Sequence, residues 1–286
     1  MKSRGEALLP HKIDRDTRLC ISLSGRPSNI GTRFHNHLYE ALRLNYAYKA
    51  FTTDNLPGAI TGIRALGIRG CGVSMPFKEA CIPFLDELDP SAAGLRSVNT
   101  IVNDRDDAGG SRLRGYNTDY LAVRTLLDRH DVSPGLPFAL RGSGGMARAV
   151  LCALRDSGFT NGRLIARNEE TGRRLAAEYS LPWQPDTTGI AEGSLLVNVT
   201  PLGMAGGPEA GTLAFEPGLI AAAAHVFDVV AMPAETPLIR AAREAGKPVI
   251  TGAEVIALQA LEQFVLYTGV RPTEEQAAAA AAYSQA

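Results

Sequence analysis

Three observations predict a two-domain α/β fold. The chain has 286 residues, and domains usually contain roughly 100–200 residues. Hydrophobic residues make up 45% and charged residues 21% of it, which is ordinary globular composition and excludes wholesale disorder. Short apolar segments alternate with amphipathic helical patterns along most of the length. From about residue 118 this alternation becomes strict, which predicts a parallel sheet covered by helices on both faces.

The first part of the chain predicts a mixed series of elements. We expect, in order, a strand at 19–24, a helix at 34–46, a helix at 56–66, and strands at 69–74, 97–103 and 112–116. In the first helix Leu38, Leu42 and Tyr46 recur at helical spacing. A segment rich in Asp and Gly joins the last two strands, and this composition favours a hairpin turn.

The second part predicts successive β-α-β units. The expected helices are 118–130, 146–157 and 169–179, and the expected strands are 137–141, 163–167, 195–199, 225–230 and 247–251. An apolar helix at 253–268 follows. The alanine-rich segment at the end of the chain has high helix propensity and predicts a surface helix.

Charge excludes several classes of partner. Lys plus Arg number 29 and Asp plus Glu number 30, so the net charge is -1. A near-neutral chain lacks the basic surface of proteins that bind nucleic acid or an anionic membrane. No uncharged apolar run approaches the roughly 20 residues of a membrane helix. Because the first residues also lack the apolar core of a signal peptide, we expect a cytoplasmic protein.

The cysteines and histidines do not predict a metal site. The chain has 4 cysteines without a CxxC pair and 5 scattered histidines. Three of the cysteines lie in apolar stretches, where a free cysteine is usually a small buried hydrophobe.

A glycine-rich segment between an expected strand and an expected helix fits the dinucleotide-binding pattern G-x-G-x-x-[GA]. Its residues are Gly142, Ser143, Gly144, Gly145, Met146 and Ala147. In this setting the first glycine permits a tight turn, the second lets the backbone approach a pyrophosphate, and the alanine allows close packing of helix on strand. The helix N-terminus would direct N–H groups and a positive dipole end at phosphate. An ordinary glycine-rich turn is the alternative interpretation.

The end of the next expected strand indicates which dinucleotide binds. An NAD site places Asp or Glu there, about 20 residues after the glycines, to bind the ribose hydroxyls. Here Arg167 and Asn168 follow the strand instead, and arginine can pair with a 2′-phosphate and stack on an adenine. With Arg173 as a candidate second phosphate contact, the sequence favours NADP. Solvated charges at a helix start are the alternative.

Several segments together resemble the shikimate dehydrogenase family, and they span nearly the whole chain. The matching segments are Gly72–Lys78 (family pattern N-V-T-x-P-x-K), Ser97–Thr100 (A-V-N-T), Gly115–Asp119 (G-Y-N-T-D), Gly142–Arg148 (G-x-G-G-x-A-R), Asn198–Met204 (N-A-T-P-x-G-M), Thr236–Leu238 and Gly252–Ala260. Such ordered agreement is hard to reach by chance.

The resemblance implies an NADP-dependent oxidoreductase of the shikimate pathway, which interconverts shikimate and 3-dehydroshikimate in a cleft between two domains. By match of motif, Lys78 and Asp119 form the catalytic pair. The lysine acts as acid and base at the substrate hydroxyl, and the carboxylate orients it. The other implied residues bind substrate (Ser74, Asn99 and Gln259) or cofactor (Asn198, Val199, Thr200 and Gly252). A buried, hydrogen-bonded structural glutamine is the alternative for Gln259.

The segment expected to hold the substrate carboxylate departs from the family pattern. The family has a Ser-x-Ser pair before its first helix, whereas the loop from Gly25 to Asn36 is two residues shorter and lacks that pair. Ser24, Ser28 and Thr32 can still donate hydrogen bonds to a carboxylate.

Two further departures leave the substrate open. Gly72 replaces the asparagine of N-V-T, which removes a hydroxyl contact, and Glu254 replaces a glycine near the nicotinamide. The first interpretation is a shikimate dehydrogenase, and the second is a dehydrogenase of the same mechanism for quinate or a related hydroxylated ring acid. A non-catalytic ligand sensor is the third, against which the intact Lys78 and Asp119 argue.

The resemblance also divides the chain. Residues 1–119, completed by helices in 253–286, would form an N-terminal α/β substrate-binding domain, and residues 120–252 a Rossmann-type NADP-binding domain. The expected partner is a small shikimate-like acid, without nucleic acid or membrane, and the protein is expected to be a monomer or a homodimer.

Overall fold

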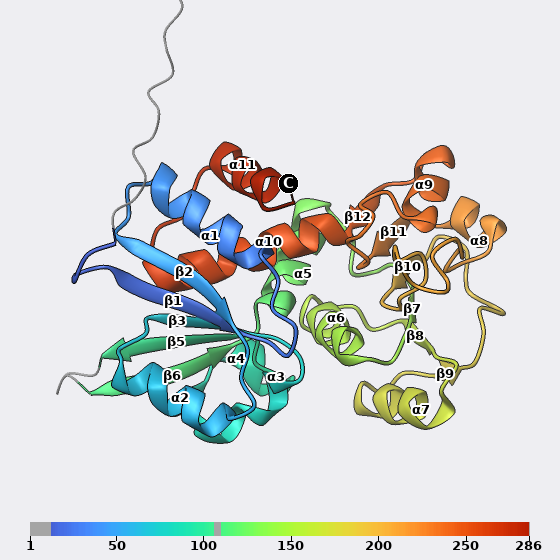
Figure 1. Cartoon of the computed structure of the whole chain (residues 1–286). Coiled ribbons are helices and arrows are strands. Elements are labelled where there is room, and N and C mark those ends of the chain that lie inside the picture. The colour runs from blue at the N-terminus through green and yellow to red at the C-terminus, as the bar shows by residue number, and fades with distance from the viewer. Residues whose placement is uncertain (1–12, 106–109, 286) are drawn as a thin grey trace, which may run out of the picture. The chain divides into compact units, whose positions relative to one another are not determined.

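The structure is a computed structural model that describes residues 13–105 and 110–285 (Figure 1). The chain forms two compact units, which we call unit 1 (Met1–Thr118 with Ala260–Ala286) and unit 2 (Asp119–Gln259). Each unit contains a six-stranded sheet with helices packed on it, so the predicted α/β class is confirmed.

Unit 1 contains a mixed sheet in the order β2-β1-β3-β5-β6-β4. Its strands are β1 (Arg18–Leu23), β2 (Tyr46–Phe51), β3 (Gly70–Val73), β4 (Glu87–Leu88), β5 (Thr100–Arg105) and β6 (Ser111–Tyr116). β1 pairs in parallel with β2 and β3, whereas β5 runs antiparallel to β3 and β6. The expected hairpin is therefore present, and its turn at residues 106–109 lies outside the described residues.

Helices pack on both faces of this sheet. They are α1 (Ile30–Ala41), α2 (Leu56–Ala65), α3 (Phe77–Ala80), a 3-10 turn (Ile82–Phe84), α4 (Pro90–Ala93), the second half of α10 (Gly252–Thr268) and α11 (Glu274–Gln285). On one face Ile21 of β1 packs in a buried cluster with Ile60 of α2. On the other, α10 lies so close that a Cβ on Gly70 would stand 2.2 Å from the Tyr267 ring.

The predicted helix at 34–46 is wrong at its C-terminal end. α1 stops at Ala41, because Arg43 adopts a left-handed φ of 53° and the Leu44 N–H turns back to the Tyr39 carbonyl at 2.9 Å. Tyr46 instead begins β2, where it is buried. Its helical spacing from Leu42 was therefore misleading.

The alanine-rich segment forms the expected helix, α11, and this helix packs on α1. Ala280 is fully buried, and the Tyr283 ring stacks on His37 with the ring centroids 5.0 Å apart. In the described ranges no helix is both long and apolar enough to cross a membrane.

Unit 2 contains the predicted parallel sheet. Its strands are β7 (Phe138–Arg141), β8 (Gly162–Ile165), β9 (Trp183–Gln184), β10 (Leu195–Asn198), β11 (His225–Asp228) and β12 (Val249–Thr251). Its helices are α5 (Thr118–Arg129), α6 (Gly145–Asp156), α7 (Glu169–Glu178), α8 (Pro217–Ala222), α9 (Pro237–Glu244) and the first half of α10. The order β12-β11-β10-β7-β8-β9 is that of a Rossmann fold. It reverses direction between β7 and β10, where such sheets bind ligands at their carboxyl ends.

Candidate active site

The predicted substrate residues of unit 1 lie where neighbouring strands and α1 begin or end. β1 and β3 pair in parallel, so Ser24 and Ser74, which follow them, lie at the same edge of the sheet. The Ser74 N–H donates to the Leu23 carbonyl at 2.9 Å. Ser28 precedes α1, and Thr32 lies in the first turn of α1. This edge therefore carries hydroxyl groups from three segments of unit 1.

Asn99 has a buried amide that is only half satisfied. Its Oδ1 atom accepts hydrogen bonds from the Thr118 N–H (2.8 Å), the Thr118 hydroxyl (3.1 Å) and the Thr100 hydroxyl (2.9 Å). A backbone N–H can only donate, so this contact fixes which end of the amide is oxygen. The Nδ2 atom is buried without a hydrogen-bond partner among the described residues. Leaving such a donor unpaired costs about 1–3 kcal/mol, which a ligand oxygen would recover.

A glutamine that was not predicted from the sequence supports Asn99. Gln263 on α10 is buried, and its Nε2 atom donates to the Asn99 carbonyl at 3.1 Å and to the Thr100 hydroxyl at 3.0 Å. The predicted Gln259 lies one turn earlier on α10, is half-buried and is the last residue of unit 2. The i,i+4 spacing of two glutamines on an apolar helix was the available signal.

Tyr48 is a second residue that was not predicted. A Cβ atom on Gly72 would lie 2.9 Å from the Tyr48 hydroxyl and 3.6 Å from Gln263 Oε1. The glycine in place of the family asparagine therefore leaves space that the tyrosine hydroxyl approaches. The Tyr48 ring stacks on His35 with centroids 4.3 Å apart, and burial raises the pKa of its hydroxyl. The Tyr48 hydroxyl therefore stays protonated and can act as a neutral hydrogen-bonding group.

The two predicted catalytic residues belong to different units. Lys78 is half-buried on α3 of unit 1, and its carbonyl accepts the Val98 N–H at 2.8 Å, one residue before Asn99. Asp119 is buried in the first turn of α5 and follows Thr118, which is bonded to Asn99. Within unit 1, Asn99 therefore lies next in sequence to a residue that is hydrogen-bonded to Lys78, and it is bonded to Thr118, the residue that precedes Asp119.

The glycine-rich loop joins β7 to α6, as predicted. Gly142 has a φ of 126°, and a Cβ there would lie 2.8 Å from a Val199 methyl group. Around Gly144 and Gly145, in contrast, no described residue outside their own stretch of chain comes within 4 Å of where a Cβ would stand. No side chain caps α6, and Ala147 is fully buried in its first turn. The loop therefore exposes backbone beside a helix N-terminus, as phosphate binding requires.

Some predicted cofactor residues form hydrogen bonds with other residues of unit 2. The Asn168 side chain caps α7 by accepting the Thr171 N–H at 3.0 Å, and the Ser143 hydroxyl lies 2.9 Å from the Thr171 hydroxyl. Asn198 Oδ1 accepts the Thr200 N–H at 3.1 Å and the Thr200 hydroxyl at 2.6 Å. These bonds hold the segments after β7, β8 and β10 in place.

The remaining predicted cofactor residues lie on three helices of unit 2, α6, α7 and α10. Met146 is half-buried in the first turn of α6. A Cβ on Gly252 would lie 2.4 Å from the Val230 backbone, so this glycine permits close approach of two chain segments. Arg173 pairs with Glu169 at 2.8 Å and lies over the Trp183 ring, 4.3 Å from its centroid.

A cavity of about 210 Å³ lies where the strand order of unit 2 reverses. Its lining includes Arg141, Gly142, Ser143, Arg167, Asn168 and Thr200. The Arg167 guanidinium pairs with both carboxylate oxygens of Glu209, at 3.0 and 3.3 Å. Two arginines, exposed backbone and a helix N-terminus fit a phosphorylated dinucleotide.

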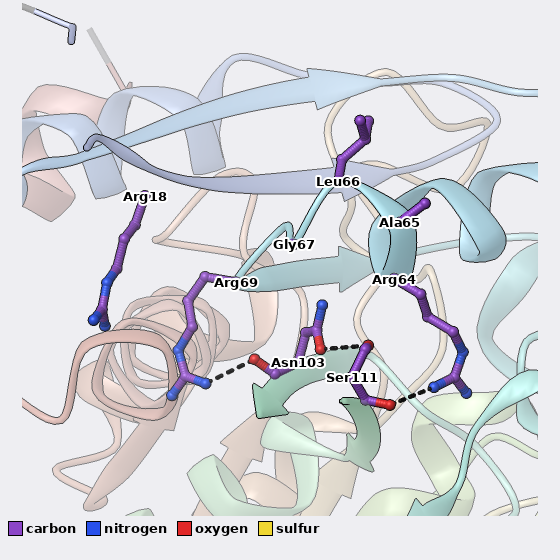
Figure 2. A pocket seen from close by; sticks show the side chains of 8 residues that line it. All are labelled: Arg18, Arg64, Ala65, Leu66, Gly67, Arg69, Asn103 and Ser111. Carbon is purple, nitrogen blue, oxygen red and sulfur yellow. Dashed lines mark hydrogen bonds between the residues drawn. The ribbon is translucent and has the colours of Figure 1, made fainter. Parts of the chain in front are cut away.

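A separate cavity of about 770 Å³ in unit 1 is lined by Arg18, Arg64 and Arg69, with Asn103 and Ser111 between the last two (Figure 2). Its arginines mainly hold elements together. Arg64 donates to the carbonyls of Ser111 and Phe84, and Arg69 to those of Asn103 and Tyr267. None of the predicted site residues lines this cavity.

Comparison with known proteins gives consistent matches. A family model described as the shikimate dehydrogenase substrate binding domain matches residues 29–101. A shikimate dehydrogenase-like protein of Haemophilus influenzae is 53% identical over 273 residues, which cover 96% of this chain and 98% of that protein. A shikimate dehydrogenase (NADP(+)) of Desulforamulus reducens is 34% identical over 276 residues, covering 90% and 92%.

Solved structures agree. A shikimate 5-dehydrogenase-like protein matches with a TM-score of 0.93 and 53% identity, covering 96% of this chain and 100% of that one. Shikimate 5-dehydrogenase of Thermus thermophilus with NADP(H) and shikimate matches with 0.79 and 28%, covering 94% and 99%. Quinate dehydrogenase of Corynebacterium glutamicum with NAD matches with 0.80 and 26%, covering 93% and 98%. This chain belongs to the shikimate dehydrogenase family.

Proposed function

We propose that the protein is an NADP-dependent shikimate dehydrogenase, which oxidises a ring secondary hydroxyl of shikimate and reduces 3-dehydroshikimate in the opposite direction. The observation that carries this proposal is the buried Asn99 amide, whose N–H groups have no partner in the described part of the chain. Gln263 bonds to the Asn99 backbone and the Tyr48 hydroxyl lies close by, so the surroundings suit a polyhydroxylated ring.

The cofactor assignment rests on unit 2. The segment from Gly142 to Ala147 would hold the pyrophosphate against α6, and Arg167 would pair with a 2′-phosphate. When bound, the nicotinamide ring supplies the hydride acceptor or donor. The relative from Desulforamulus reducens, named for NADP(+), supports this choice.

Proton transfer is assigned to Lys78 and Asp119 by match of motif. As the substrate carbon loses hydride, its hydroxyl proton passes to the neutral Lys78 amine, and the reverse reaction returns it from the ammonium. Asp119 would orient the lysine and stabilise its charge. Asn99 would hold a neighbouring hydroxyl through its free amide hydrogens.

A dehydrogenase of the same mechanism for quinate or a related ring acid is the second candidate. The exchange of the family asparagine for Gly72, with the Tyr48 hydroxyl beside it, changes the groups offered to ring hydroxyls. The similarity to a quinate dehydrogenase solved with NAD points the same way.

The test is to follow reduced cofactor formation with shikimate and with quinate, each supplied with NADP and with NAD. We expect shikimate with NADP to give the highest kcat/KM. A preference for quinate would replace the first candidate by the second. Binding of the acids without reduction of either cofactor would contradict both candidates and favour a ligand sensor.

A further inference from the structure

The Arg167 guanidinium is already engaged by an acid from another segment. Glu209 lies in the connection between β10 and α8, and its two carboxylate oxygens accept from both Nη atoms of Arg167. This two-point geometry is also the one in which arginine binds phosphate. A 2′-phosphate and Glu209 would therefore compete for the same donors.

The position of Glu209 is fixed by its own backbone. Its carbonyl accepts hydrogen bonds from the Gly203 N–H and from the Thr212 N–H, each at 3.0 Å. The residue is thus anchored inside a closed turn, although its side chain remains about one-third exposed. The backbone hydrogen bonds therefore fix where the Glu209 side chain begins, while the Arg167 side chain that it pairs with is 69% exposed and accessible to a ligand.

A second arginine faces the same cavity. Arg141 is half-buried, lines the cavity together with Arg167, and donates to the Ala214 carbonyl. Burial and the Arg167 charge lower the pKa of Arg141, whereas Glu216 and Glu209 raise it. Glu209 thus offsets positive charge on two arginines where a phosphate would bind.

We propose that Glu209 reduces the preference of this protein for NADP over NAD, by occupying the donors of Arg167 that a 2′-phosphate needs. The inference rests on the proposed dinucleotide function of unit 2. A nucleotide without the 2′-phosphate has no group that competes with Glu209 for the donors of Arg167. Glu209 therefore lowers the affinity of the site for NADP and leaves its affinity for NAD unchanged. The ratio of the two affinities becomes smaller.

The test is calorimetric binding of 2′,5′-ADP and of 5′-AMP to the full-length protein, which requires neither substrate nor turnover. The variant Glu209→Gln keeps the size of the side chain and removes its charge. We expect it to bind 2′,5′-ADP about fivefold more tightly, the change that a weak exposed ion pair corresponds to, and to bind 5′-AMP unchanged. The double variant Glu209→Gln with Arg167→Gln should lose this gain.

The matched control is Glu262→Gln. Glu262 forms an equivalent two-point pair with Arg271 in unit 1, with both distances 2.9 Å, and lies outside the cavity. It should change neither affinity. Equal or weaker binding of 2′,5′-ADP by Glu209→Gln would overturn the inference, as would tighter binding that survives loss of Arg167.

The same titrations separate this inference from the proposed function. If the wild-type protein binds 2′,5′-ADP no better than 5′-AMP but the Glu209→Gln variant prefers 2′,5′-ADP, the inference stands and the assignment of NADP fails. If neither nucleotide binds to any variant, the nucleotide site fails and the inference falls with it.

Discussion

The oxygen and the nitrogen of the Asn99 side-chain amide have different surroundings. Its oxygen accepts three hydrogen bonds, two of them from Thr118, while its nitrogen has no partner in the described part of the chain. The oxygen therefore fixes the orientation of the amide, and the nitrogen is left to bind a ligand. In the proposed function, the same residue would hold the start of α5 through its oxygen and bind a substrate hydroxyl through its nitrogen.

Lys78 provides the most direct test of the chemistry. Lys78→Ala should lower kcat by about 10²–10⁴-fold, the usual contribution of a positioned acid or base, and leave KM within about threefold. Steady-state kinetics with shikimate and NADP measure both values. Lys49→Ala is the control, because Lys49 is exposed on β2 and its ammonium lies 4.2 Å from the Phe51 ring centroid. Turnover that survives in Lys78→Ala would mean that Lys78 is an ordinary surface lysine.

Residues within sequence motifs could be proposed as site residues from the sequence, whereas residues that join the site through distant contacts could not. Asn99 and the loop from Gly142 to Ala147 were recognised because their neighbours in sequence form the pattern. Gln263 contacts Asn99 across 164 positions, and the partner of Arg167 lies 42 positions away. Such pairs depend on how strands and helices are ordered, which local pattern does not contain.

At the scale of elements, Arg69 connects three parts of unit 1. It precedes β3, donates to the Asn103 carbonyl of β5 at 2.9 Å, and donates to the Tyr267 carbonyl of α10 at 2.9 Å. The last carbonyls of a helix have no partner within it and carry its negative dipole end. Arg69 therefore holds α10 against the sheet.

Arg69→Ala should lower the free energy of unfolding by about 2–3 kcal/mol, since several charge-assisted hydrogen bonds are lost together. Urea unfolding followed by circular dichroism measures this change. Arg15→Ala is the control, because the Arg15 side chain is almost fully exposed and pairs with the neighbouring Asp16 at 3.5 Å. A loss below about 0.5 kcal/mol, the level of an ordinary surface substitution, would contradict this role of Arg69.

Helices and strands could be predicted where a regular hydrophobic pattern extends over many residues. The helices and strands of unit 2 follow one another in β-α-β order, and their sheet was predicted correctly. β4 and β9 have two residues each, too few to show an alternation. β2 was missed because Tyr46 also continued the helical spacing of α1, and the conformation of Arg43 that ends this helix is set by the turn.

At the scale of the molecule, the two units carry buried groups that respond to pH in opposite directions. In unit 1, burial lowers the pKa of His35 from 6.5 to about 4. On acidification His35 is protonated in the unfolded chain before it is protonated in the folded protein. The free energy of unfolding is therefore unaffected by this group above pH 6.5 and decreases as the pH falls toward 4. In unit 2, burial raises the pKa of Asp228 from 3.8 to about 6, so stability is lost as the pH rises through that range.

Two variants should show the opposing slopes. We compare the free energy of unfolding of the wild type with that of each variant as the pH is lowered from about 7 to 4.5. The difference from His35→Phe should fall by about 2–3 kcal/mol. The difference from Asp228→Asn should rise by about 2 kcal/mol. Urea unfolding can distinguish the units, because the single tryptophan, Trp183, lies in β9 of unit 2. Fluorescence therefore follows unit 2, and circular dichroism follows both. Slopes of the same sign for both variants would refute this assignment.

Gly72 and Tyr48 border the same space, so substitutions at the two positions are coupled. A Cβ on Gly72 would meet the Tyr48 hydroxyl at 2.9 Å, closer than real Cβ contacts. Adding an asparagine at 72 alone forces a clash, and shortening Tyr48 alone leaves a hole beside the site. An asparagine at position 72 is therefore expected to be tolerated only together with a smaller side chain at position 48.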